Sequence, residues 1–258
     1  MTAGPRVALL LVVLCWASAD AAPRPFPFTW TSQTLEVGAH DFEAWLTPRI
    51  ARADDSLVLT DTRVAITTGL APHLEALWGL DLDFVANKSS TTVDPLLTTA
   101  WRWAPLTADQ ALGVGGLARA SLGFDSAELE ARLFADKQLG KLLFAINGAA
   151  SRRFFWSGRT GVDTHLEESV GVRYGVGPTA SFGLELSLRS GFQDGAYQGT
   201  AVSVGPSFSF SFGKLWLSVG AAAQVAADKA PADRGNGQPL ELRDNERFMG
   251  RLVLGYAD

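Results

Sequence analysis

The chain has 258 residues, of which 47% are hydrophobic and only 19% charged, with 26 Gly, 15 Phe and 8 Trp. Its net charge of −5 and its dispersed Lys and Arg residues provide no basic surface, which argues against nucleic acid as a partner. The low charge and the many glycine and aromatic residues are also unusual for a soluble domain.

The first residues are typical of an export signal. Arg6 precedes an apolar run, and small residues that fit an A-x-A cleavage pattern follow it. The run is shorter than the roughly 20 residues that span a bilayer as a helix. We therefore expect residues 1–21 to be a signal peptide that is removed on export. The only cysteine, Cys15, would leave with it, and Leu14 before it does not suit lipidation.

Alternation is the main signal in the rest of the chain. In residues 74–84, LEALWGLDLDF, one set of alternate positions is apolar and the other carries Glu75, Asp81 and Asp83. Since successive side chains of a strand point to opposite faces, this pattern predicts a strand with one apolar and one polar face. The same pattern predicts twelve strands: 35–47, 57–68, 74–85, 95–104, 111–123, 126–136, 141–151, 164–176, 179–191, 199–212, 214–226 and 245–256.

The polar faces of these strands favour a membrane barrel over a soluble fold. In 164–176, 179–191 and 199–212 the second face holds serine, glycine and charged residues, which are hard to bury in a soluble core. We predict an all-β fold, a closed antiparallel up-and-down transmembrane β-barrel of about 12 strands, with 10 as the alternative. A soluble β-sandwich or lipocalin-like carrier is the competing fold.

The links between strands differ in length. Compact links are expected at 69–73, 104–110, 135–141, 175–179 and 212–214, and longer ones at 87–94, 151–164 and 226–245, while 124–126 breaks the rule. Outer-membrane barrels have short periplasmic turns and longer outer loops. We therefore expect residues 22–34 to be a short periplasmic N-terminal segment, residues 35–258 to form the barrel, and 226–245 to be a mobile outer loop.

The chain resembles a bacterial outer-membrane β-barrel over nearly all of its mature length. Its final strand, with Gly250, Leu254 and Tyr256, resembles the signal read by the barrel-assembly machinery, although it ends in Ala257 and Asp258. The resemblance implies a Gram-negative outer-membrane location, with membrane lipid and that machinery as partners. Within the class, the chain is similar to the barrels named for the MetA pathway of phenol degradation, a similarity that implies handling of small organic molecules and rests on Glu36, Glu43, Trp45, Thr47, Arg63, Gly69, Leu70 and Glu75.

The residues give little support for catalysis, a cofactor or a metal. His165 and Ser169 on one strand lie about 13 Å apart, too far for proton transfer. Asp81 and Asp83 would lie about 6–7 Å apart, but pairing with arginines of the lumen is the simpler interpretation. There is no ligand cysteine and no His pair at strand spacing. The predicted lumen-lining residues are Asp61, Arg63, Glu75, Asp81, Asp83, Arg102, Arg119, Glu128, Glu130, Arg132, Glu167, Arg173, Glu185, Arg189, Arg247 and Arg251.

Two functions fit these residues. The first is a narrow, porin-like channel or transporter for small solutes, favoured because Ser and Gly on 199–212 and 214–226 leave one lumen wall thin and uncharged. The second is a closed barrel with a structural or adhesive role through its outer loops. An outer-membrane enzyme is a distant third.

Overall fold

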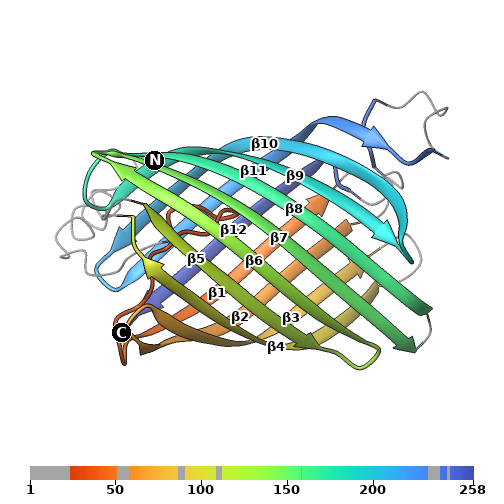
Figure 1. The fold of residues 1–258 in the computed structure, drawn as a ribbon, viewed down its shortest axis with the longest axis horizontal. Coiled ribbons are helices and arrows are strands. Elements are labelled where there is room, and N and C mark those ends of the chain that lie inside the picture. Colours follow the sequence, from red (N-terminus) through yellow and green to blue (C-terminus); the bar gives the residue numbers. More distant parts are fainter. Residues whose placement is uncertain are drawn as a thin grey trace, which may run out of the picture.

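The computed structural model describes residues 24–50, 58–86, 91–108, 112–157, 159–231, 239–242 and 245–258. Within these residues, twelve antiparallel strands follow one another around a closed barrel in which β1 pairs with β12 (Figure 1). The predicted twelve-strand fold is confirmed. The strands are β1 (His40–Ile50), β2 (Val58–Ala71), β3 (Leu74–Ala86), β4 (Thr91–Leu106), β5 (Gly113–Leu122), β6 (Ser126–Leu139), β7 (Leu142–Ser157), β8 (Arg159–Gly175), β9 (Ala180–Gln193), β10 (Ala196–Phe212), β11 (Leu215–Lys229) and β12 (Phe248–Ala257).

The two faces of the barrel are those that alternation predicts. On β3, Trp78 and Leu80 are 43% and 41% exposed, whereas Asp81 between Leu80 and Leu82 is only 9% exposed. Within the described residues, no helix has the length and the apolar character needed to cross a membrane. The outward apolar residues therefore form the surface that lipid would cover, and the polar residues face the lumen.

The two ends of the barrel differ. We call the end with His40 and Ala257 the periplasmic end, because both termini of the barrel lie there together with the short turns 72–73, 140–141 and 213–214, whereas the longest link, 230–247, lies at the opposite end. At the opposite, outer end, the links 123–125, 158 and 194–195 are also short. The expected long link at 151–164 was wrong: β7 and β8 continue as a paired ladder to Trp156 and Thr160. Alternation continues through this stretch, since Arg152 and Phe154 are outward and exposed while Arg153 and Phe155 are not.

Part of the expected outer loop folds inward. β11 continues to Lys229, and beyond it Glu241, Asn245 and Glu246 are buried. Gln224 Nε2 donates a hydrogen bond of 2.9 Å to the carbonyl oxygen of Glu241, and Asn245 Nδ2 donates one of 2.6 Å to Glu241 Oε2. The expectation of a mobile loop at 226–245 is wrong for Glu241 and Asn245, because their polar groups bind the barrel and each other. Residues 232–238 and 243–244 lie outside the described part.

The first strand starts later than predicted. Residues 35–39 form a turn in which Gly38 has a φ of +83°, and its amide donates to Gly69 O at 2.8 Å. Gly69 N in turn donates to Ala39 O at 3.0 Å, so this turn is attached to the end of β2. β1 begins immediately afterwards at His40, and the chain before the turn enters the lumen. The predicted signal peptide, residues 1–21, lies outside the described residues.

Candidate functional site

Residues 24–39 are here called the inner segment: residues 24–34 lie inside the lumen, and residues 35–39 form the turn that leads to β1. Three backbone amides of the segment donate hydrogen bonds to side chains of the wall. Phe28 N donates to Glu185 Oε2 on β9 at 3.1 Å, and Trp30 N donates to Asn147 Oδ1 on β7 at 2.7 Å. Ser32 N donates to a carboxylate oxygen on β6. That last acceptor is Asp136 Oδ1, at 2.8 Å. The amides of Phe28, Trp30 and Ser32 thus each meet an acceptor side chain from a different strand.

The wall is shaped for this segment. A Cβ added at Gly171 on β8 would lie 2.8 Å from the Phe26 ring, and one at Gly220 on β11 would lie 2.5 Å from Pro27. Real Cβ contacts are longer than these, so only glycine leaves room for the segment at both positions. The prediction that residues 22–34 precede the barrel in the periplasm therefore differs from the structure: residues 24–34 lie inside the barrel, because their amides satisfy lumen acceptors.

Cationic and aromatic side chains stack beside the segment. Arg24 pairs with Glu43 on β1 at 2.7 Å, and its guanidinium carbon lies 3.9 Å from the centroid of the Trp30 ring. Trp30 and Trp45 are 6.3 Å apart between ring centroids. Cations over aromatic faces are attracted by the ring quadrupole, so these contacts help to fix the segment.

A cavity of about 570 Å³ lies in the lumen beside the inner segment. Phe28 and Trp30 of the segment contribute to its lining, and Asn245 and Glu246 of the inward-folded loop contribute at the outer end. We call this cavity the chamber. Eleven of the sixteen predicted lumen residues line it: Asp61, Arg63, Asp81, Asp83, Arg119, Glu128, Glu130, Arg132, Glu167, Arg189 and Arg251.

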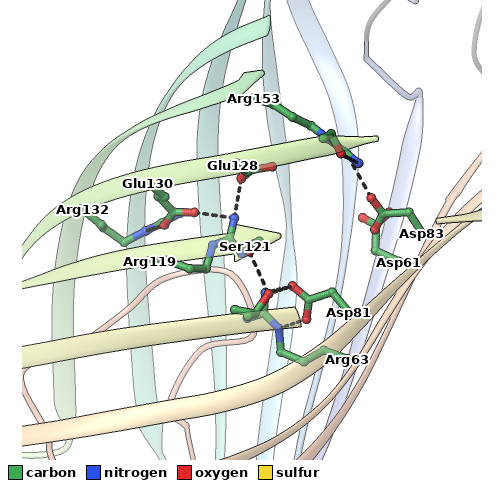
Figure 2. Close-up of polar contacts among 12 residues, drawn as sticks. Asp61, Arg63, Asp81, Asp83, Arg119, Ser121, Glu128, Glu130, Arg132 and Arg153 are labelled. Carbon is green, nitrogen blue, oxygen red and sulfur yellow. Dashed lines mark hydrogen bonds and ion pairs between the residues drawn. The ribbon is translucent and has the colours of Figure 1, made fainter. Parts of the chain in front are cut away.

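Ion pairs join the charges on one side of the chamber (Figure 2). Arg63 binds Asp81 through two bonds, Nε to Oδ1 at 2.5 Å and Nη2 to Oδ2 at 2.8 Å. Thr98 Oγ1 donates to the same Asp81 Oδ2 at 2.9 Å. Bidentate pairing of this kind holds both side chains in one geometry, so the Asp81 carboxylate is fixed against the barrel wall.

A second chain of ion pairs crosses β5, β6 and β8. Arg119 Nη2 lies 2.6 Å from Glu128 and 2.8 Å from Glu130 (Figure 2), and Arg132 Nε lies 3.1 Å from Glu130. Arg132 also reaches Glu167 on β8 at 3.2 Å. Each guanidinium therefore sits between carboxylates, which offsets the cost of enclosing these charges in a narrow lumen.

Sequence reasoning missed two arginines of the chamber. Arg153 pairs with Asp83 at 3.2 Å and also with Asp94, and Arg49 pairs with Asp61 at 2.6 Å. Arg153 had been placed in a link, and Arg49 lies beyond the predicted end of its strand. The alternation Arg153 in, Phe154 out and Phe155 in could have revealed the longer strand.

Five predicted lumen residues lie outside the lining of the chamber. Glu75 pairs with Arg102 at 2.6 Å and also accepts a hydrogen bond of 3.0 Å from Leu35 N, so both lie against the inner segment. Glu185 binds Phe28 N of the same segment. Arg173 is half-buried on β8, and Arg247 is exposed, with its guanidinium carbon 5.4 Å from the centroid of the Phe248 ring. Among the described residues, no group of three or more His, Cys, Asp or Glu side chains could hold a metal ion.

No protein-family model matches the chain, and no curated protein matches it. Solved structures do match. An outer-membrane channel from Pseudomonas putida F1 aligns with a TM-score of 0.60 and 15% identity over 88% of this chain and 98% of that one. The NanC porin aligns with a TM-score of 0.51 and 12% identity over 85% of this chain and 98% of the porin. The chain thus has the fold of bacterial outer-membrane barrels; the similarity to the barrels named for the MetA pathway stays a prediction.

Proposed function

We propose that this protein is a narrow outer-membrane channel for small solutes. The chamber is the observation that carries the proposal: it is a polar cavity of about 570 Å³ inside the barrel, in the size range of small-molecule sites. Its wall is stiffened by ion pairs between strands, so it can remain open to water. A purely structural barrel would gain nothing from a polar cavity of this volume.

The inner segment makes the passage narrow. It is held by side chains from separate strands rather than by a strand ladder, and each of these hydrogen bonds is worth about 1 kcal/mol. We infer that solutes pass beside the segment or shift it slightly. Wide, unselective diffusion is not expected, since the segment contacts the wall from β3 to β9.

The competing functions have less support. An adhesive barrel would use long outer loops, but the links 123–125, 158 and 194–195 are short, and the described part of the long loop folds inward. An enzyme would need a free acid or base, whereas Asp81 and Asp83 are both paired with arginines. We therefore expect neither adhesion nor catalysis to be the main activity.

Planar-bilayer recording of the purified, refolded barrel tests the proposal. Folding is verified first by heat-modifiable migration on a gel and by the β-sheet circular dichroism spectrum. We expect discrete, small conductance steps. A barrel that passes both folding checks and stays electrically silent would contradict the channel and favour the structural role.

A further inference from the structure

The charges of the lumen are distributed unequally between its two halves. In the part of the chain that the structure describes, lumen arginines of β1–β7 such as Arg63, Arg119 and Arg153 each contact a carboxylate. Arg173 on β8, Arg189 on β9 and Arg251 on β12 form no ion pair with any described residue. Positive charge is therefore ion-paired along one half of the wall and is not along the other, where Glu167, the cross-strand neighbour of Arg189, is ion-paired with Arg132.

These three arginines occupy successive positions along the lumen. Arg189 and Arg251 line the chamber. Arg251 donates to Thr47 Oγ1 and to Pro27 O, both at 3.1 Å, so its partners are neutral and it lies at the level of the inner segment. Arg173 lies closer to the periplasmic end, two residues beyond Gly171, which faces Phe26 of the segment. The row thus runs from the chamber past the segment.

The wall between these arginines consists of small and hydroxyl residues. Ser207, Ser211 and Ser218 are 1%, 2% and 0% exposed, and the Oγ atom of each has no hydrogen-bond partner in the protein. Buried hydroxyls are normally hydrogen-bonded, so these three have unused capacity to donate. Ser207 and Arg173 lie on either side of Gly183: a Cβ added at Gly183 would lie 2.9 Å from Ser207 Oγ and 3.4 Å from Arg173 Cα.

Carboxylates on this half offset the arginines only in part, although Glu167 lies opposite Arg189 in the strand register. Glu167 is bound by Arg132, and Glu185 accepts the Phe28 amide. Asp163 and Glu246 line the chamber from the outer end: Asp163 lies near the start of β8, and Glu246 lies just before β12. A solute that moves from the chamber toward the periplasm therefore meets guanidinium groups, which are hydrogen-bond donors for negatively charged oxygen.

We propose that this half of the lumen is a path for small anions, carboxylates in particular, with Arg189, Arg251 and Arg173 as successive contacts. The inference rests on the proposed channel function and defines its substrate class. A carboxylate would exchange contacts with Arg189 and Arg251 in the chamber for a contact with Arg173. Uncompensated charge focused in a narrow lumen raises the local concentration of ions of opposite sign.

Reversal potentials measured in a salt gradient across a planar bilayer test the inference. The wild-type channel should prefer chloride to potassium, and acetate should carry current in place of chloride. Arg173→Ser and Arg189→Ser should each lower the anion-to-cation permeability ratio by about threefold, the change that about one kT of local potential produces. Arg152→Ser is the matched control, because Arg152 is exposed on the outer face of β7 beside Phe154.

The outcomes separate this inference from the channel itself. A folded wild-type barrel without conductance contradicts the proposed function. A conducting barrel that prefers cations, that excludes acetate, or whose selectivity is unchanged in the Arg173→Ser, Arg189→Ser double variant overturns the anion path and leaves the channel standing.

Discussion

Two hydrogen bonds join the side chain of Asn147 to the backbone of Trp30. Asn147 Oδ1 accepts from Trp30 N at 2.7 Å, and Asn147 Nδ2 donates to Trp30 O at 2.9 Å, across 117 residues of sequence. One amide side chain on β7 thus satisfies both backbone groups of a residue at the middle of the inner segment. This contact makes the position of the segment testable.

Replacing Asn147 with Ala should loosen the inner segment without affecting the barrel wall. Two hydrogen bonds are lost, each worth about 1 kcal/mol, so we expect amide exchange of Phe28 to Ser32 to accelerate by roughly tenfold or more. Single-channel conductance should increase. Hydrogen exchange read by mass spectrometry checks the first effect, and unchanged exchange would mean that Asn147 does not hold the segment.

Filling Gly220 should displace the segment by a different mechanism. A Gly220→Val side chain would occupy the space of Pro27, whose Cγ would lie 2.5 Å from the added Cβ. We expect a folded barrel with higher conductance. Gly148→Val is the control, because nothing lies within 4 Å of a Cβ at that outward position. Equal conductance in both variants would show that the segment does not limit the passage.

Gly255 should matter for closure of the barrel. It faces Trp216, which is fully buried and whose Nε1 donates to Asp41 Oδ1 on β1 at 3.1 Å. A Cβ at Gly255 would overlap the indole ring, and overpacking of this kind typically costs about 1–3 kcal/mol. Gly255→Ala should lower the unfolding temperature seen as heat modifiability, while Gly148→Ala should not. An unchanged temperature for Gly255→Ala would contradict tight packing here.

The pair of Arg63 and Asp81 should behave as a coupled unit. Arg63→Ala leaves the buried Asp81 carboxylate without its bidentate partner, which typically costs about 3–5 kcal/mol. Adding Asp81→Ala should recover much of the loss. Urea unfolding of the two single variants and the double variant in detergent gives the coupling free energy. A coupling near zero would mean that the pair is not formed in solution.

Strand number and facing could be predicted because both depend on neighbouring residues. Trp78 and Asp81 lie on opposite faces for a local reason: they are three positions apart, and side chains an odd number of positions apart on a strand point to opposite faces. The ends of strands were less predictable. Outward residues such as Arg152 interrupt the apolar face near a strand end, so the alternation signal weakens while the ladder continues.

The contents of the lumen could not be predicted in the same way. Residues 24–34 have no alternation that marks them as part of the barrel, and their partners Asp136, Asn147 and Glu185 are far away in sequence. Arg153 and Asp94 are likewise 59 residues apart. No local pattern records such pairs.

The sequence by itself therefore determined the alternating strands and the polar lining, since these follow from which side of each strand meets lipid. Only the tertiary structure decided that the inner segment occupies the lumen, that the lumen arginines of β1–β7 form ion pairs and that Arg173, Arg189 and Arg251 form none with the described residues. The physical reason is closure: curling the sheet into a barrel brings side chains of distant strands across a narrow lumen, and the pairing depends on register and on which strands become neighbours.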